Sequence, residues 1–357
     1  MGNERETVEA LRQEMTSAMS NVRLQPETLE ALRQGLTSPP ASLLSPLRYA
    51  TSMFGFPQYS AHAQLGVHQV EMAKLALQIT EMQIALNESN LNAQQKEKKV
   101  QEINAQYREL EAKQSLSHLL QRVGPDAQEK LLRSQDFKKR FTPDSPSNAY
   151  VLSIDIRRST ELMLKARDPK RFARFIIELA DKLRATILDS YGVFDKFTGD
   201  GILAFFPDFY SGQDAGWYAI QAASTCHKIF AAHYEANKNC FISVLKDIGL
   251  GIGLDYGEVQ VVQIGSDFTV VGTPVVYACR MGGAEAKCTY ANQPAYEQLF
   301  ERYSAICDFD DTEIDIKHEG NTQAYRIRLN GKLYTAQQPD WLAEGDESEA
   351  AKMPTEA

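Results

Sequence analysis

The sequence predicts an α/β or α+β domain at residues 147–330, preceded by a long helical region. From Tyr150 onward, short apolar runs that are typical of strands alternate with longer runs of helical periodicity. A stretch rich in turn-forming residues, 142–148, separates this pattern from the helices before it. Hydrophobic residues make up 43% of the chain and charged residues 24%, which is ordinary for a folded protein.

The N-terminal part divides into three segments. Residues 1–60 form a polar region that several prolines make irregular beyond residue 37. In residues 65–110 apolar side chains recur every three or four positions, and we expect a parallel, dimeric coiled coil. The alternative is a single amphipathic helix packed on its own domain. Residues 115–140 predict a helical linker, interrupted at Gly124-Pro125-Asp126.

Within 147–330 the elements alternate as expected for one mixed sheet with helices. In order, the sequence predicts a buried strand at 150–156, a helix at 168–188, a hairpin of strands 192–197 and 201–206, a helix at 212–236, strands at 248–257, 258–265 and 268–272, a helix at 274–286, and a final hairpin within 313–329. The acidic segment 337–357 is expected to be a disordered tail.

Charge and cysteine content narrow the class of function. The net charge of −9 argues against a surface that coats nucleic acid or anionic lipid. The five cysteines are scattered and form no Cys-x-x-Cys pair, which favours reduced thiols. No apolar stretch approaches the ~20 residues that span a bilayer, and the N-terminus lacks the pattern of a secretory signal. We therefore expect a cytoplasmic protein.

Two aspartates carry the strongest chemical signal. Asp155 lies near the end of an apolar strand, and Asp200 lies between two glycines at the tip of a hairpin. Two carboxylates that converge at one edge of a sheet are suitable ligands for hard divalent cations. Ser159 and Thr160 cap the next helix, whose N-terminal N–H groups suit phosphate. This set predicts a two-metal phosphoryl-transfer site. The alternative is that each aspartate is only a capping or turn residue.

Four sequence blocks support the chemical interpretation. SIDIRRST, FDKFTGDGILAFF, GIGLDYGEV and FTVVGTPVVYACRM, in this order and spacing, resemble the catalytic domain of class III nucleotidyl cyclases. The resemblance implies that 147–330 is such a domain, with a ferredoxin-like sheet and helices on one face. It also implies a head-to-tail homodimer with two composite active sites.

The resemblance assigns a role to each matching residue. Asp155, Asp200 and the backbone carbonyl of Ile156 would bind two magnesium or manganese ions, and Ser159 and Thr160 would hold the terminal phosphates. The other subunit would supply four further side chains: Lys196 and Thr269 to read the base, Arg280 to stabilise the transition state, and Lys317 to bind the triphosphate.

One position departs from the family. An Asn that orients the ribose usually lies four residues before the arginine, whereas this chain has Val276. Valine forms no hydrogen bond with a ribose. Loss of one such bond costs about 3 kcal/mol, or about a hundredfold in rate, which leaves activity possible. The alternative is a degenerate cyclase that serves as a nucleotide-binding or scaffold module.

The sequence gives two indications about the base. Lys196 with Thr269 resembles the adenine-reading pair of bacterial adenylate cyclases, which favours ATP. Pro274, Val276 and Tyr277 resemble the pyrimidine cyclases of bacterial antiphage (Pycsar) systems. We expect UTP to be converted to cyclic UMP, with CTP second among the pyrimidines and ATP as the main rival. This resemblance implies antiviral defence, with the product read by a separate effector protein.

Two other motifs have a structural interpretation. Gly249-x-Gly251-x-Gly253 precedes a strand pattern instead of a helix, so it predicts close strand packing and no dinucleotide fold. The six histidines show no metal-ligand spacing.

Overall fold

The structure is a computed structural model that describes residues 78–80, 82, 93–141, 146–264, 267–316 and 320–343. These residues belong to two compact units, of which the second contains 108–343. The predicted region 1–60, most of the predicted coiled coil and the chain beyond residue 343 lie outside the described residues.

Helix α5 (Ala93–Leu120) covers the end of the predicted coiled coil. In its first part, Ile103 is buried and Val100 and Tyr107 are half-buried, whereas Glu97 and Lys98 are exposed. These apolar residues follow the predicted spacing of three and four. Pairing with a second copy stays a prediction.

The first half of the domain predicted at 147–330 is a β-α-β-β-α-β unit. Its elements are β1 (Pro146–Arg157), α8 (Ser159–Leu164), α9 (Pro169–Asp189), β2 (Val193–Thr198), β3 (Gly201–Pro207), α10 (Asp208–Ser211), α11 (Ala215–Ala236), the 3₁₀ turn Lys238–Cys240 and β4 (Gly249–Ile264). The strands lie in the order β2-β3-β1-β4, and every neighbouring pair is antiparallel. This is the ferredoxin-like arrangement that was predicted.

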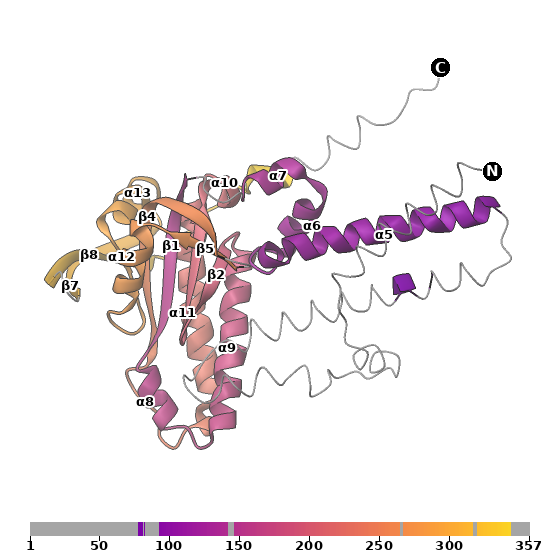
Figure 1. The fold of residues 1–357 in the computed structure, drawn as a ribbon. Coiled ribbons are helices and arrows are strands. Elements are labelled where there is room, and N and C mark those ends of the chain that lie inside the picture. The colour runs from indigo at the N-terminus through magenta and orange to yellow at the C-terminus, as the bar shows by residue number, and fades with distance from the viewer. Residues whose placement is uncertain are drawn as a thin grey trace. The chain divides into compact units, whose positions relative to one another are not determined.

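The second half extends the sheet beyond β4. It comprises β5 (Asp267–Val271), which pairs with β4, then α12 (Thr273–Gly282), β6 (Cys288–Ala291), α13 (Gln293–Tyr303), β7 (Cys307–Ile316) and β8 (Gly320–Leu329). Strand β6 runs parallel to β4, and the order continues to β8 and β7. The β7–β8 hairpin extends from the edge of the sheet (Figure 1). Acidic residues occupy half of β7: Asp308, Asp310, Asp311, Glu313 and Asp315.

Two differences from the predicted elements have simple causes. Strand β4 is one strand of 16 residues where two were expected. Its partner β1 pairs with it continuously from Gly249 to Gln260, so the junction at Gly257-Glu258 does not interrupt the ladder. Strand β6 was not predicted, because a strand of 4 residues is too short to show a period. Helix α13 was also missed, although its buried residues Ala295, Leu299 and Tyr303 recur every four positions.

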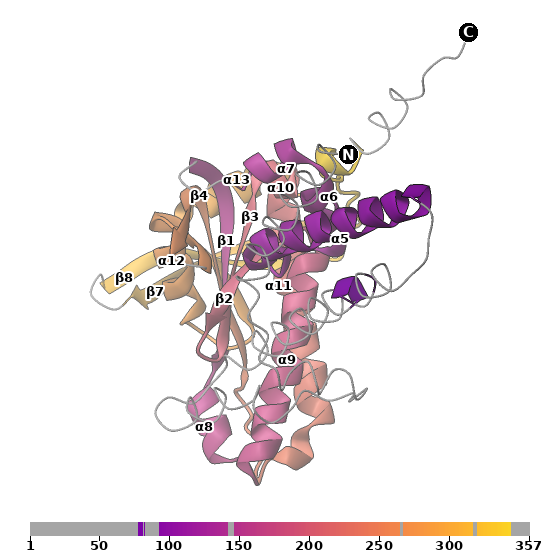
Figure 2. The ribbon, with the colours of Figure 1, turned by 45° about the vertical axis from the view of Figure 1, so that its right-hand side comes forward.

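Helices cover both faces of the sheet. On one face α9 and α11 run side by side (Figures 1 and 2). The alternate β1 side chains Tyr150, Leu152, Ile154 and Ile156 belong to the core on this face. On the other face Ala149 and Val151 share a core with Ala278 of α12 and with α6 (Pro125–Arg133) and α7 (Gln135–Lys139). The expectation of helices on one face is therefore corrected.

Helix α9 shows how the sequence specifies these elements. Asp168 caps it by accepting a hydrogen bond of 2.8 Å from the amide of Lys170, and Pro169 follows at the first helical position. Its buried stripe includes Phe172, Phe175, Ile176, Leu179 and Leu183. The stripe has helical periodicity and packs on the face of the sheet that carries Ile154 and Ile156.

The packed fold continues past residue 330, the expected end of the domain. Trp341, in α14 (Asp340–Ala343), is buried, and its ring stacks on Tyr210 at 5.4 Å and 7°. The indole N–H donates to the Tyr210 carbonyl oxygen at 2.6 Å. The segment 337–343, expected within a disordered tail, is therefore packed against the domain through Trp341, although most of its other side chains are exposed.

Among the described residues, no helix is both apolar enough and long enough to cross a bilayer.

Candidate active site

The β2–β3 hairpin brings Asp200 beside the end of β1. Gly199, at the first position of the two-residue loop, has φ +75°, as a tight hairpin turn of this kind requires. A Cβ on Gly201 would lie 2.2 Å from the carbonyl oxygen of Ile154, so only glycine permits this approach. Because Ile154 immediately precedes Asp155, the turn places one aspartate near the other.

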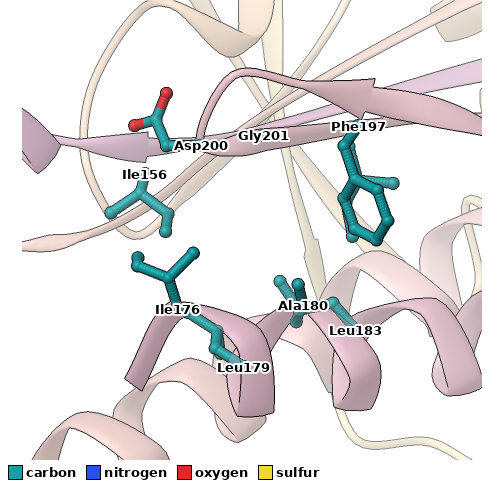
Figure 3. Close-up of a pocket in the computed structure, with 9 residues that line it drawn as sticks. Ile156, Ile176, Leu179, Ala180, Leu183, Phe197, Asp200 and Gly201 are labelled. Carbon is teal, nitrogen blue, oxygen red and sulfur yellow. The ribbon is translucent and has the colours of Figure 1, made fainter. Parts of the chain in front are cut away.

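The Asp200 carboxylate points away from the apolar core. An apolar pocket under the hairpin is lined by Asp200 itself, by Ile156 and Phe197, and by side chains of α9, among them Ile176 and Leu179. Figure 3 shows Asp200 directed to the opposite side, away from these side chains. The side chain of Ile156 is used in the core, so its backbone carbonyl is the group left to act as a ligand.

The two aspartates interact electrostatically. Burial and then the negative charge of Asp200 raise the pKa of Asp155. Arg157 offsets part of this rise, because its Nη1 lies 2.6 Å from Asp155 Oδ2. The oxygen Oδ2 of Asp200 is buried and has no hydrogen-bond partner among the described residues. A buried carboxylate oxygen without a hydrogen-bond donor lowers the stability of the fold unless a cation binds to it.

This donor set fits a divalent cation. Asp155, Asp200 and the Ile156 carbonyl offer only oxygen, as magnesium and manganese prefer. Within the described ranges no cluster of three or more His, Cys, Asp or Glu side chains could hold a metal ion. A cation at this site would therefore need substrate or water oxygens to complete its shell.

The predicted phosphate turn lies directly after β1. Ser159 is half-buried and Thr160 exposed at the start of α8, which has 6 residues. The prediction that they cap this helix is wrong, because they are its first two residues and Arg158 occupies the N-cap position without a side-chain hydrogen bond. Arg158 precedes them in the left-handed region, with φ 62°. Its guanidinium is 2.6 Å from Glu161 Oε2. The turn is thus presented to solvent beside Asp155.

The predicted base-reading residues contact each other. Lys196 Nζ donates to Thr269 Oγ1 at 2.8 Å, and Thr269 Oγ1 donates to Asp195 Oδ2 at 2.9 Å. Asp195 also lies 3.3 Å from Arg122 Nη1 through its Oδ1. Burial raises the pKa of Asp195, and Lys196, Arg122 and Thr269 each act in the opposite direction. A register shift in β2 between Phe194 and Lys196 accommodates Asp195.

Helix α12 carries the predicted arginine. Arg280 is half-buried, and its Cζ lies 5.7 Å from the centre of the Tyr277 ring. Val276 lies one turn before it and is 46% exposed, so it is not a core residue. Lys317 lies outside the described residues.

Three neighbours of the predicted residues were missed or left open by the sequence. Arg157 could be read as a phosphate ligand or a solvated residue, and instead pairs with Asp155. Asp195 could have been noticed in the sequence as an acidic residue inside an apolar strand. No sequence pattern marks Arg122, since its partner is 73 residues away.

Comparison with known proteins gives fold neighbours only. No protein-family model and no curated protein matches the sequence. Among solved structures, the adenylyl cyclase CyaB from P. aeruginosa is 19% identical, with a TM-score of 0.46, over 54% of this chain and 97% of that one. The guanylyl cyclase Cya2 is 20% identical, with a TM-score of 0.47, over 55% and 100%. The guanylate cyclase domain of RhGC from Catenaria anguillulae is 16% identical, with a TM-score of 0.42, over 52% and 98%. At TM-scores below 0.5 these likenesses carry no weight for function.

Proposed function

We propose that the chain is a class III nucleotidyl cyclase, a phosphorus–oxygen lyase that converts a nucleoside triphosphate to a 3′,5′-cyclic nucleotide and pyrophosphate. The observation that carries the proposal is the Asp155–Asp200 pair. The two carboxylates come from β1 and from the β2–β3 turn, whose close approach to β1 only Gly201 allows, and one of their oxygens is buried without a donor. Such a pair suits a cation, and a triphosphate is the substrate that brings oxygen ligands to it.

The reaction joins the ribose 3′ oxygen to the α-phosphorus, breaks the bond to pyrophosphate and releases the hydroxyl proton. Asp155, Asp200 and the Ile156 carbonyl would hold magnesium or manganese, two ions per site. When bound there, the metal would supply Lewis acidity, which would lower the pKa of the attacking hydroxyl and stabilise charge on the phosphates. Ser159, Thr160 and Lys317 bind the phosphates, and Arg280 stabilises charge in the transition state.

The site is composite in this proposal. The metal aspartates belong to one subunit of a homodimer, whereas Lys196, Thr269, Arg280 and Lys317 come from the other. Each dimer then holds two sites.

The substrate we favour is UTP, giving cyclic UMP as a signal in antiphage defence that a separate effector reads. The resemblance of Pro274, Val276 and Tyr277 to pyrimidine cyclases supports it. CTP is the next pyrimidine, and ATP to cyclic AMP is the main alternative.

A second candidate is a degenerate cyclase that binds nucleotide without turnover. Two observations favour it: Val276 has no group to orient a ribose, and Arg157 already forms an ion pair with Asp155 at 2.6 Å.

One experiment separates these possibilities. Purified protein is incubated with manganese and all four triphosphates at equal concentration, and products are resolved by mass. We expect cyclic UMP to predominate and Asp155→Ala or Asp200→Ala to remove it. The matched control is Asp310→Ala, an exposed aspartate on β7, which should leave activity unchanged. Predominant cyclic AMP would overturn the pyrimidine assignment. If no cyclic product forms from any triphosphate, the proposal that the chain is an enzyme is wrong.

A further inference from the structure

Asp195 is a buried carboxylate next to the proposed base-reading pair. Asp195 is 1% exposed, and the side chains of three other residues surround its carboxylate. Arg122 Nη1 lies 3.3 Å from Oδ1, while Thr269 Oγ1 at 2.9 Å and Lys196 Nζ at 3.6 Å approach Oδ2. Arg122 also donates to the backbone carbonyl oxygen of Asp195.

These contacts determine the direction of each hydrogen bond. A carboxylate only accepts, an ammonium only donates, and a hydroxyl has one proton and two lone pairs. Thr269 must therefore give its proton to Asp195 and accept one bond from Lys196. What Thr269 has left to offer a ligand is one lone pair, and Lys196 offers the remaining ammonium protons.

A nucleobase can match this pair at an edge where a donor adjoins an acceptor. Uracil presents its ring N3–H beside O4, whereas cytosine and adenine present an exocyclic amine beside a ring nitrogen. The bases differ in which edge atom donates a hydrogen bond and which accepts one. Lys196 and Thr269 can therefore discriminate among the bases only if both side chains are held in place and each keeps its role as donor or acceptor.

We propose that Asp195 is a positioning residue that fixes the hydrogen-bond polarity of Thr269 and Lys196 for base recognition, and that Arg122 holds Asp195 in place. This inference rests on the proposed function, since it assumes that Lys196 and Thr269 contact the base. Arg122 lies between α5 and α6, and its carbonyl oxygen accepts the Phe194 amide at 2.9 Å. The segment that precedes the catalytic domain thereby contributes to the base site.

The test is Asp195→Asn, which keeps the shape and removes the charge. An amide can donate to Thr269 and free its proton, which reverses the polarity toward the base. We measure kcat and KM for all four triphosphates. KM for the preferred one should rise by about tenfold to a hundredfold, with kcat nearly unchanged, because base contacts are present in ground state and transition state alike. The ratio of kcat/KM between preferred and next-best base should fall toward one.

Two further variants separate positioning from general damage. Asp214→Asn is the matched control. Asp214 is also buried and lies 3.3 Å from an arginine, Arg302, but it contacts neither Lys196 nor Thr269. It should lower stability without changing the ratio between bases. In a Thr269→Val background, Asp195→Asn should add little further loss of selectivity, because it acts through the missing hydroxyl.

The outcomes are distinct. If Asp195→Asn does not fold, Arg122→Gln takes its place and should shift the base ratio in the same direction. An active wild type with an unchanged ratio in the folded variant overturns this inference alone. An equal loss with all four triphosphates does the same. A wild type that makes no cyclic product overturns the proposed function and this inference with it.

Discussion

Asp155 and Asp200 carry like charges in a partly buried place, and the fold maintains them there against their repulsion. The raised pKa of Asp155 records this, since burial and Asp200 both disfavour its charged form. Arg157 compensates only one of the two carboxylates. Residues that are retained at a cost to stability are typical of functional sites.

We predict that Asp200→Asn stabilises the metal-free protein. Removing one of the two charges should raise the free energy of unfolding by about 1 kcal/mol, which corresponds to an increase in Tm of about 2–4 °C. Manganese should raise the Tm of the wild type but not that of the variant, because only the wild type binds it. Thermal unfolding with and without manganese checks both. An equal manganese effect on the two proteins would contradict the metal assignment.

We predict that His227 makes stability depend on pH. Burial lowers the pKa of His227 to about 4, from 6.5 in the unfolded chain. Between these values the unfolded state binds more protons, so stability is lost as the pH falls from 6.5 toward 4. The wild type should lose about 2 kcal/mol more than His227→Gln between pH 7 and pH 4.5. Urea unfolding at both pH values measures the difference, and parallel losses would refute the prediction.

The sequence was sufficient to predict which site residues lie side by side when both residues belong to recognisable motifs. The structure brings Asp200 beside Asp155 and Thr269 beside Lys196, although the roles of these residues stay predictions. Arg122 could not be found in this way. Its contact with Asp195 depends on how a helical linker docks on the edge of a sheet, and no local pattern encodes that docking.

Among the elements, β4 and α12 are joined by an unusually close contact. A Cβ on Gly251 would lie 2.3 Å from the carbonyl oxygen of Gly282, and one on Gly253 would lie 2.0 Å from that of Ala278. The sequence predicted close packing for these glycines without identifying the partner. Periodicity shows that a strand packs tightly, whereas the partner depends on tertiary structure.

We predict that Gly253→Ala disrupts this contact. The backbone of α12 is the obstacle and cannot rotate away, so the variant should lose about 3 kcal/mol or more, or displace α12 together with Arg280. Gly331→Ala is the control, because that glycine has φ +83° and nothing within 4 Å of the added carbon. The control should cost only about 1 kcal/mol. Similar unfolding free energies for the two variants would show that the contact is unimportant.

At the scale of the whole molecule, the proposed homodimer makes each site depend on two chains. The aspartates proposed to bind metal lie at the end of β1 and the β2–β3 turn, whereas Arg280 lies on α12. In the proposed homodimer each site combines the aspartates of one subunit with the base-reading residues and arginine of the other. The number of working sites then depends on how subunits are combined.

We predict that mixing two inactive variants restores activity. Asp200→Ala and Arg280→Ala subunits, allowed to exchange, should form mixed dimers that contain one intact site and one site with both defects. With random pairing, about a quarter of the wild-type activity should return. The control is each variant incubated alone. A mixture as inactive as its parents would place all the residues of a site in one chain.

The arrangement of the strands also affects how the protein behaves in concentrated solution. A sheet can grow by adding a strand from another molecule wherever an outer strand is uncovered. At the β2 end, the Phe194 amide and the Asp195 carbonyl are both engaged by Arg122, which blocks this growth. At the β7 end, the acidic side chains of the strand repel an identical strand. We therefore expect clear solutions at low ionic strength and self-association at about 1 M salt, where the repulsion between acidic strands is screened. Light scattering across a salt series would reveal this association, and a flat profile would show that charge does not protect this edge.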